Sequence, residues 1–256
     1  MQKLKAILLL SLLVACKALA TDTTSVLYVA LPGQTEMYEK PSFKWDVESY
    51  PLRSGTAVTV IPADVAAPLD TFETDDNIKL PGKWLLVYTS EDTGFVFDAL
   101  FLPFRMEQYS DVFKNKHDYC EPEELPFFEH IFGTGDTALI DVKPFGNAVE
   151  YFKTKKANTR YCVQQFTRKL GKGFTFTYSR PADYEYAPVF YLESTDISLT
   201  QMYCIATMFN NGQTSRGYSL FGTKIYSDYF GERDCYTSKI YQKGNKVIWA
   251  FSYYCE

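Results

Sequence analysis

The sequence predicts a mainly β fold, in which a small barrel is followed by a β-rich antiparallel domain with one short helix. The 256 residues include 20 Tyr and 20 Phe, and aromatic side chains favour strands. Short β-branched and aromatic runs alternate with Gly and Pro turns in both halves of the chain. Cysteine is absent between residues 17 and 119, whereas five cysteines follow residue 119. This asymmetry predicts two modules, over residues 24–104 and 105–256.

Residues 1–20 are typical of an export signal. Lys3 and Lys5 precede an apolar run from Ala6 to Ala15. This run has about half of the ~20 residues that a membrane-spanning helix needs. We therefore expect the leader to direct export rather than to remain as a spanning helix.

Two cleavage sites compete at the end of this leader. Leu13-Val14-Ala15-Cys16 resembles the bacterial lipobox, in which the Cys is lipidated and becomes the mature N-terminus. Acyl chains such as palmitate on Cys16 would anchor the exported protein to a membrane of the bacterial cell envelope, in the periplasm or at the cell surface. Cleavage after Ala18-Leu19-Ala20 by an ordinary signal peptidase would instead release a secreted protein.

The first module is predicted to contain four strands joined by loops of unequal length. The loop after the first strand is long and polar and contains Pro41 and Pro51. Residues 62–81 form a second, acidic and proline-containing excursion. The strands are expected at residues 26–31, 56–61, 84–88 and 95–101. Short strands with Gly turns at irregular spacing predict a small barrel.

Five motifs in this module occur in the order of a known family. A V-x-Y-V strand is followed by the loop Tyr38-Glu39-Lys40-Pro41-Ser42, an L-x-x-G-T-x-V-x-V strand, a G-x-W-x-x-V strand and the turn-strand Glu91-Asp92-Thr93-Gly94-Phe95-Val96. Together they resemble the bacterial SH3-like domain, over residues 24–104. The chain departs from the family where Arg often precedes the loop proline, and in the length of the 62–81 excursion.

The resemblance implies a binding or targeting module for cell-wall peptide or for another protein. Such a barrel can present aromatic side chains in a groove beside its long loop. We place Tyr38, Trp45, Tyr50 and Trp84 at this groove. The alternative is that Tyr38 and Trp45 pack under the loop as a small satellite core. Trp84, Phe95 and Phe97 alternate on strands, and at least half of them are expected in the core.

The second module is predicted to be an antiparallel meander, as a sheet or a barrel, with a small helix packed on it. Residues 121–133 favour this helix, because prolines suit its first turn and Gly133 ends it. Turns are expected at 169–173, 210–212 and 243–245, the last two as hairpins. The strands are expected at 137–143, 148–154, 159–168, 173–179, 187–193, 201–209, 216–227, 233–241 and 246–255.

Cysteine usage fits export to an oxidising compartment. Either cleavage site removes Cys16 from the count, and the remaining five allow at most two bridges and one odd thiol. The sequence leaves the connectivity open. The candidates for disulfide bonds are Cys120, Cys162, Cys204, Cys235 and Cys255.

Composition argues against several other function classes. The net charge is −5, without a basic cluster, which disfavours nucleic-acid binding. The only histidines are His117 and His130, and the sequence has no C-x-x-C pair, so no metal site is predicted. Asp75-Asp76-Asn77 lacks the ligand spacing of a calcium loop and is interpreted as a solvated loop.

No catalytic residue or cofactor is predicted. Asp234-Cys235 resembles the start of a Cys/His peptidase site, but no His follows it. A G-x-S-x-G motif and a phosphate-binding loop are both absent from the sequence. The predicted function is therefore a non-catalytic, lipid-anchored envelope protein whose first module binds a cell-wall component or an envelope protein. The alternatives are an envelope-acting hydrolase, a cell-wall peptidase or glycosidase using carboxylates or Cys235, and a purely structural envelope protein.

Overall fold

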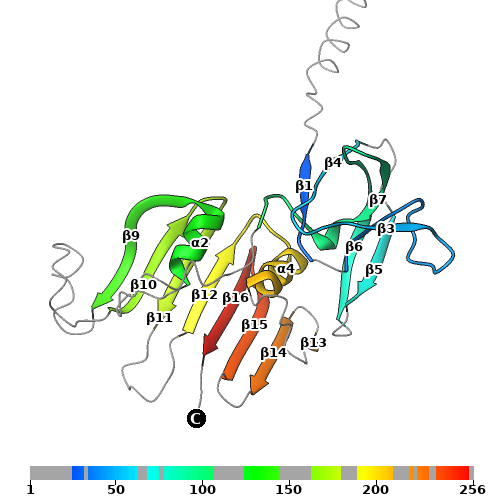
Figure 1. The fold of residues 1–256 in the computed structure, drawn as a ribbon. Coiled ribbons are helices and arrows are strands. Elements are labelled where there is room, and N and C mark those ends of the chain that lie inside the picture. The colour runs from blue at the N-terminus through cyan, green and yellow to red at the C-terminus, as the bar shows by residue number, and fades with distance from the viewer. Residues whose placement is uncertain are drawn as a thin grey trace, which may run out of the picture.

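A computed structural model describes residues 25–31, 34–62, 68–74, 78–106, 124–144, 163–179, 189–209, 219–221, 224–230 and 235–253. These residues form a mainly β protein with two antiparallel sheets of eight strands each (Figure 1), which confirms the predicted fold class.

The first sheet belongs to the N-terminal module. Its strands are β1 (Val26–Val29), β2 (Glu36–Tyr38), β3 (Ser49–Pro51), β4 (Ala57–Val60), β5 (Leu69–Glu73), β6 (Lys79–Tyr88), β7 (Thr93–Phe97) and β8 (Phe101–Leu102). A 3₁₀ helix, η1 (Asp98–Leu100), joins β7 to β8. The spatial order is β3-β2-β7-β6-β4-β1-β8, and β5 pairs with β6 outside this path. Among the described residues, β3 and β8 lie at the two ends of this order and do not pair with each other, so the described strands do not form a closed barrel.

The four strands predicted in this module are present as β1, β4, β6 and β7. Two predicted loops contain further strands. The long polar loop holds the β2–β3 hairpin, and the 62–81 excursion holds β5 and the start of β6. The excursion folds back as a hairpin because Ile78 and Leu80 reach the core, where both are almost fully buried.

The second sheet belongs to the C-terminal module. Its strands are β9 (Thr134–Pro144), β10 (Val163–Leu170), β11 (Phe174–Ser179), β12 (Val189–Ser194), β13 (Ser219–Phe221), β14 (Lys224–Phe230), β15 (Cys235–Lys243) and β16 (Lys246–Tyr253). The spatial order is β13-β14-β15-β16-β12-β11-β10-β9. The predicted helix is present as α2 (Leu125–Phe132), which ends at Gly133.

Most of the strand predictions in this module are confirmed, with shifted ends. The predicted strand at 216–227 is divided between β13 and β14, and the one at 148–154 lies outside the described residues. The turn at 243–245 joins β15 to β16, with Gly244 at a φ of 63° that glycine adopts easily. The turn at 169–173 joins β10 to β11, with Lys172 and Gly173 at φ 55° and 73°.

The strand predicted at 201–209 is wrong, because this segment forms the helix α4 (Leu199–Phe209). Every residue from Met202 to Phe209 is buried, so hydrophobic periodicity does not separate helix from strand here. The described residues of the second module therefore contain two helices rather than the single one predicted. The turn predicted at 210–212 lies outside the described residues, and the element before it is a helix rather than a hairpin strand.

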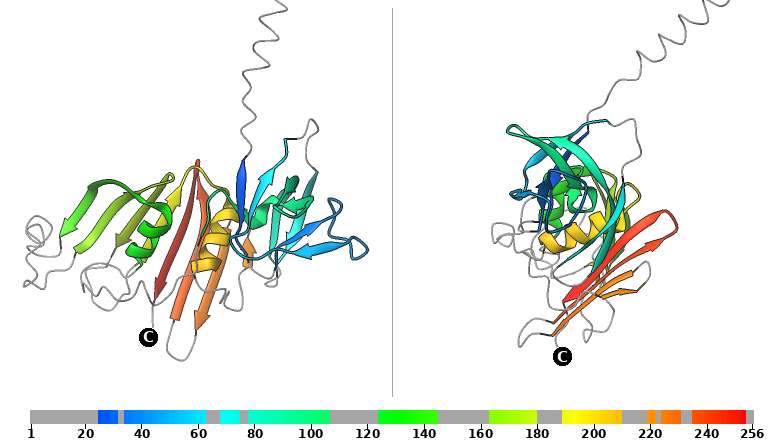
Figure 2. Two further views of the ribbon diagram at one scale, coloured as in Figure 1. Left: turned by 45° about the horizontal axis from the view of Figure 1, so that its top comes forward. Right: turned by 90° about the vertical axis from the view of Figure 1, so that its right-hand side faces the viewer.

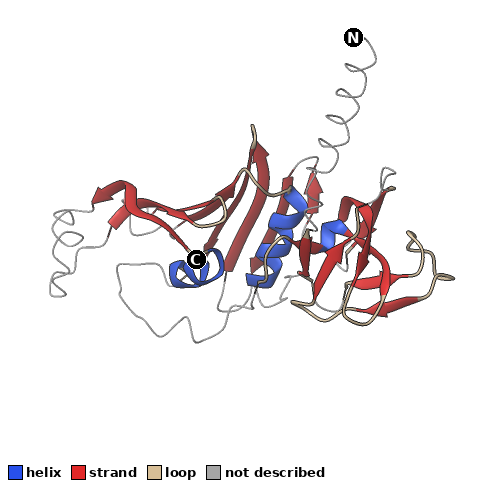
Figure 3. Cartoon of the chain, turned by 90° about the horizontal axis from the view of Figure 1, so that it is seen from above, coloured by secondary structure: helices blue, strands red, loops and turns tan. Residues whose placement is uncertain are grey.

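Both helices cover the same face of the second sheet (Figure 3). Phe128 of α2 and Phe209 of α4 stack with ring centroids 5.3 Å apart, and both rings contact Trp249 and Phe251 of β16. Strand β11 alternates strictly, with its phenylalanines and Tyr178 toward the helices. The opposite face of the sheet carries partly buried polar and aromatic side chains, Thr175, Thr177 and Tyr191 among them.

One hydrophobic core runs through both modules. Helix α4 contacts η1 and β8 of the first module, between the two sheets (Figure 2). The Cys204 thiol on α4 donates a hydrogen bond to the Ala99 carbonyl on η1 at 3.3 Å. Phe104 packs edge to face against Phe132 of α2 at 5.5 Å. We call this contact region, made by α4, η1, β8 and Phe104, the seam.

Candidate functional site

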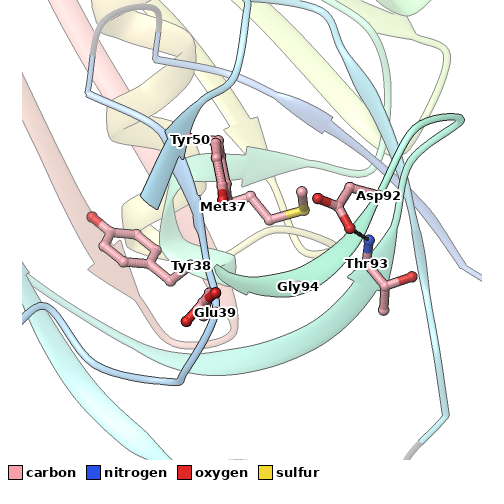
Figure 4. Close-up of a pocket in the computed structure, with 7 residues that line it drawn as sticks. All are labelled: Met37, Tyr38, Glu39, Tyr50, Asp92, Thr93 and Gly94. Carbon is pink, nitrogen blue, oxygen red and sulfur yellow. Dashed lines mark hydrogen bonds between the residues drawn. The ribbon is translucent and has the colours of Figure 1, made fainter. Parts of the chain in front are cut away.

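The first module carries a shallow cavity of about 110 Å³ on the β2–β3 hairpin (Figure 4). The cavity lies where this hairpin meets the turn before β7. Its lining residues are Met37, Tyr38, Glu39, Tyr50, Asp92, Thr93 and Gly94. We call it the hairpin pocket.

Strand pairing decides which side chains face the hairpin pocket. Met37 of β2 is directly opposite Tyr50 of β3, so their side chains share one face of the hairpin. The Glu39 amide donates to the Glu48 carbonyl at 3.1 Å, which places Glu39 and Glu48 opposite each other, two residues further along the ladder than Met37 and Tyr50. Because side chains alternate along a strand, Glu39 and Glu48 lie on the same face as Met37 and Tyr50.

Gly94 at the start of β7 makes room for this arrangement. A Cβ at this position would lie 2.7 Å from Met37 Cγ and 2.9 Å from the Tyr38 carbonyl oxygen. Both distances are shorter than side-chain carbons tolerate, so the strand can approach β2 only without a side chain here. Figure 4 shows Met37 and Asp92 pointing toward each other across this gap.

The hairpin pocket has a negative rim. The Tyr50 hydroxyl donates a 3.5 Å hydrogen bond to Glu48 Oε2. The charge of Glu48 raises the pKa of Tyr50 most, and Glu39 and Asp92 raise this pKa further. Asp92 Oδ1 accepts a hydrogen bond from the Thr93 amide at 2.7 Å. Within the described part of the chain, none of the three carboxylates forms an ion pair with a cationic side chain.

The four aromatic residues predicted for a groove have different environments. Tyr38 and Tyr50 both line the hairpin pocket, and Tyr50 is 48% exposed. The Tyr38 ring itself points away from Met37 and Tyr50 and packs edge to face on Trp84 at 5.2 Å. Its phenol is half-buried, and burial raises its pKa. Trp45 is 97% exposed on the β2–β3 loop and does not line the pocket.

Trp84 is not a groove residue, because it is only 2% exposed. Its indole Nε1 donates to Asp70 Oδ2 at 3.1 Å, and its ring contacts Phe43 and Phe97 in the core. Trp84 and Phe97 are both buried, so the expectation that at least half of Trp84, Phe95 and Phe97 lie in the core is confirmed. Trp45 does not pack under the loop, whereas Tyr38 does so in part.

The pocket also contains residues that the sequence did not single out, Met37, Glu39, Asp92 and Gly94. The signal for Asp92 and Gly94 was present in the turn motif itself, since loops and turns on a rigid scaffold are a common place for binding residues. The places of Met37 and Glu39 in the pocket follow from the pairing register of β2 and β3. This register cannot be predicted when the segment is interpreted as a loop.

The cysteine candidates are only partly within the described residues. Cys204 is a free, fully buried thiol on α4, and its pKa is raised by burial. Its Sγ faces the core, where it donates a hydrogen bond to the Ala99 carbonyl. Cys235 begins β15. Cys16, Cys120, Cys162 and Cys255 lie outside the described residues.

Asp98 is a carboxyl group whose pKa is raised by burial. Its Oδ1 accepts a 2.8 Å hydrogen bond from the Lys83 amide, so it holds η1 against β6. A Cβ on Gly82 would lie 2.5 Å from this oxygen, so the glycine allows β6 to approach Asp98 closely. This carboxyl group is structural. Across the described ranges, no group of His, Cys, Asp and Glu is arranged to hold a metal ion.

Comparison of the chain with protein-family models, curated proteins and solved structures gives no match. In the part of the chain that the structure describes, every helix is too short or too polar to cross a bilayer.

Proposed function

We propose that the chain is an exported, non-catalytic envelope protein whose first module binds a cell-wall component or an envelope protein through the hairpin pocket. The single observation that carries this proposal is the pocket itself, with the exposed Tyr50 ring on its wall and carboxylates on its rim. The leader sequence and the likeness of residues 24–104 to bacterial SH3-like domains support the same function. Anchoring through acyl chains on Cys16 is part of the proposal.

The size of the hairpin pocket favours one part of a larger ligand. Sites for complete small molecules enclose about 300–1,000 Å³. The hairpin pocket has a volume of about 110 Å³, which suits a single side chain or terminal group. The neighbouring Trp45 exposes almost its whole side chain, and Trp is enriched among the residues that dominate binding interfaces. A peptide or polymer could fill the pocket and also contact this indole.

Binding is tested by sedimentation of the full chain with purified peptidoglycan and with its soluble fragments. Tyr50→Ala and Trp45→Ala should each weaken binding by about tenfold, the loss expected for a central aromatic contact. Tyr88→Ala is the matched control, because Tyr88 is 44% exposed and lies outside the pocket. Binding by both variants at the parent's affinity would overturn the pocket as the site.

Two further measurements test the remaining parts of the proposal. Cys16→Ser should move the protein from the membrane fraction to the soluble fraction, and unchanged membrane partition would contradict lipidation. Incubation of the full chain with cell-wall material should release no fragments. Release that is lost in an Asp or Glu variant would establish a hydrolase instead.

A further inference from the structure

We infer that the hairpin pocket accepts the cationic end of its ligand, a primary ammonium or guanidinium group carried by a peptide. This inference rests on the proposed function and specifies the chemistry that the pocket recognises. Two properties support it, the charge of the rim and the nature of the wall.

The rim concentrates negative charge that the described part of the protein leaves uncompensated. Glu39 and Glu48 are neighbours across the β2–β3 ladder, and like charges directly opposite each other destabilise a hairpin. Asp92 adds a third carboxylate from a different element, the turn between β6 and β7. A cation held between these groups would relieve their mutual repulsion, so they favour a cationic ligand over an anionic or neutral one.

The wall of the hairpin pocket is suited to the same ligand. Tyr50 offers an aromatic ring that is half-exposed, and a cation above such a ring is attracted by its electron-rich face. The Met37 side chain beside it is a polarizable thioether that packs well against the methylene groups of a Lys or Arg stem. Aromatic ring, thioether and carboxylates together define a site for an alkylammonium or guanidinium group.

The two lysines of the same loop are not paired with the carboxylates of the rim. Lys40 and Lys44 lie in the β2–β3 loop and are exposed, but neither forms an ion pair with a described carboxylate. The chain as a whole carries a net charge of −5, which adds to the attraction of a cationic ligand over distance.

The inference is tested by NMR titration of the full chain with Nα-acetyl-lysine methylamide. The control ligand is its Nε-acetylated analogue, which has nearly the same shape and no charge. The amide signals of Met37, Thr93 and Gly94 should shift with the charged ligand and remain unchanged with the neutral one. The affinity should decrease as ionic strength rises, because the rim carboxylates are exposed.

Two variants test whether the carboxylates of the rim cause the binding of the charged ligand. The double variant Glu39→Gln, Asp92→Asn should weaken binding of the charged ligand by about tenfold, because it removes two of the three rim charges while keeping side-chain shape. Glu73→Gln is the control, since Glu73 is an exposed carboxylate on β5 outside the pocket. Equal binding of the charged and neutral ligands would overturn the inference, and so would equal losses in the double variant and the control.

A second comparison separates this inference from the proposed function. Peptidoglycan fragments are compared before and after chemical acetylation of their free amines. If acetylation abolishes binding at the pocket, both statements are supported. If the fragments bind through Tyr50 regardless of acetylation, the cation inference is wrong and the proposed function stands. If the fragments do not bind at all while the charged lysine ligand does, the proposed cell-wall ligand is wrong and cation recognition stands.

Discussion

Trp84 and Trp45 lie in the same module and have opposite environments. Trp84 is surrounded by Tyr38, Phe43 and Phe97 and is hydrogen-bonded to Asp70. Trp45 projects into solvent from the β2–β3 loop. The first tryptophan therefore stabilises the fold, whereas the second is available for contact with another molecule.

Substitution of the two tryptophans should separate stability from binding. Trp84→Ala should lower the free energy of unfolding by about 3–5 kcal/mol, because it removes a large buried ring and leaves a cavity. Trp45→Ala should change this free energy by about 0.5 kcal/mol or less. Urea unfolding followed by circular dichroism measures both values. A loss above about 1 kcal/mol for Trp45→Ala would mean that its side chain packs against the protein in solution.

For single residues, the sequence identifies aromatic side chains that could form a site, but not the direction in which each side chain points. It brought Tyr38 and Tyr50 to the same region, and both line the hairpin pocket. It could not assign Trp84 to the core, because a shift of one residue in strand register reverses which face a side chain occupies. The contribution of Asp92 depends on β7 approaching β2, a contact between residues that are far apart in the sequence.

Helix α4 begins at a capping box that explains its position in the chain. The Gln201 amide donates to Ser198 Oγ at 3.2 Å, and the Ser198 amide donates to Gln201 Oε1 at 2.9 Å. These reciprocal bonds satisfy two amides that would otherwise lack partners at the start of the helix. The pattern Ser-x-x-Gln before an apolar run was therefore the sequence signal for a helix at 199–209.

Removal of this cap should destabilise the protein measurably. Ser198→Ala should lower the free energy of unfolding by about 1 kcal/mol, because the amide of Gln201 loses its acceptor. Ser198→Asp is the matched variant and should retain most of the stability, since a carboxylate also caps a helix and interacts favourably with its N-terminus. Thermal or urea unfolding of the three proteins provides the measurement. Equal stability of the Ala variant and the parent would show that the capping bonds are not formed in solution.

At the scale of elements, strands bounded by distinctive turns were predictable and fully buried segments were not. The β10–β11 and β15–β16 hairpins were predictable because their turns contain glycine, at Gly173 and Gly244, in a backbone conformation of positive φ that glycine adopts easily. The segment 201–209 was predicted as a strand because burial on all sides removes the polar face that would mark a helix. The β2–β3 hairpin was missed because each strand has only three residues and the connecting loop is polar.

At the scale of the whole molecule, the seam joins two modules that the sequence distinguishes by cysteine content. Ala99, Leu100 and Leu102 of the first module belong to the same buried cluster as Tyr203 and Cys204 of α4. The thiol–carbonyl hydrogen bond crosses this boundary. A chain cut near residue 104 would expose the apolar surface of η1 and β8, so each module depends on the other for burial.

This shared core predicts that the two modules unfold together. Val58→Ala removes buried methyl groups from β4, far in sequence from the second module. It should lower the urea midpoint of hydrogen exchange equally for peptides from β6 and from β16, since one cooperative transition links them. Mass spectrometry of deuterated peptides across a urea series measures both midpoints. A shift limited to β6 would show that the modules unfold independently.

The seam also fixes how the hairpin pocket and the outer face of the second sheet are placed relative to each other. The hairpin pocket lies on the first module, and the polar, aromatic-bearing face of the second sheet lies on the side away from its helices. With α4 packed between the modules, these two surfaces are carried on one packed unit rather than on domains tethered by a loose connector. Two ligands bound at these surfaces would therefore be held at one spacing and angle, without the entropy penalty of ordering a tether.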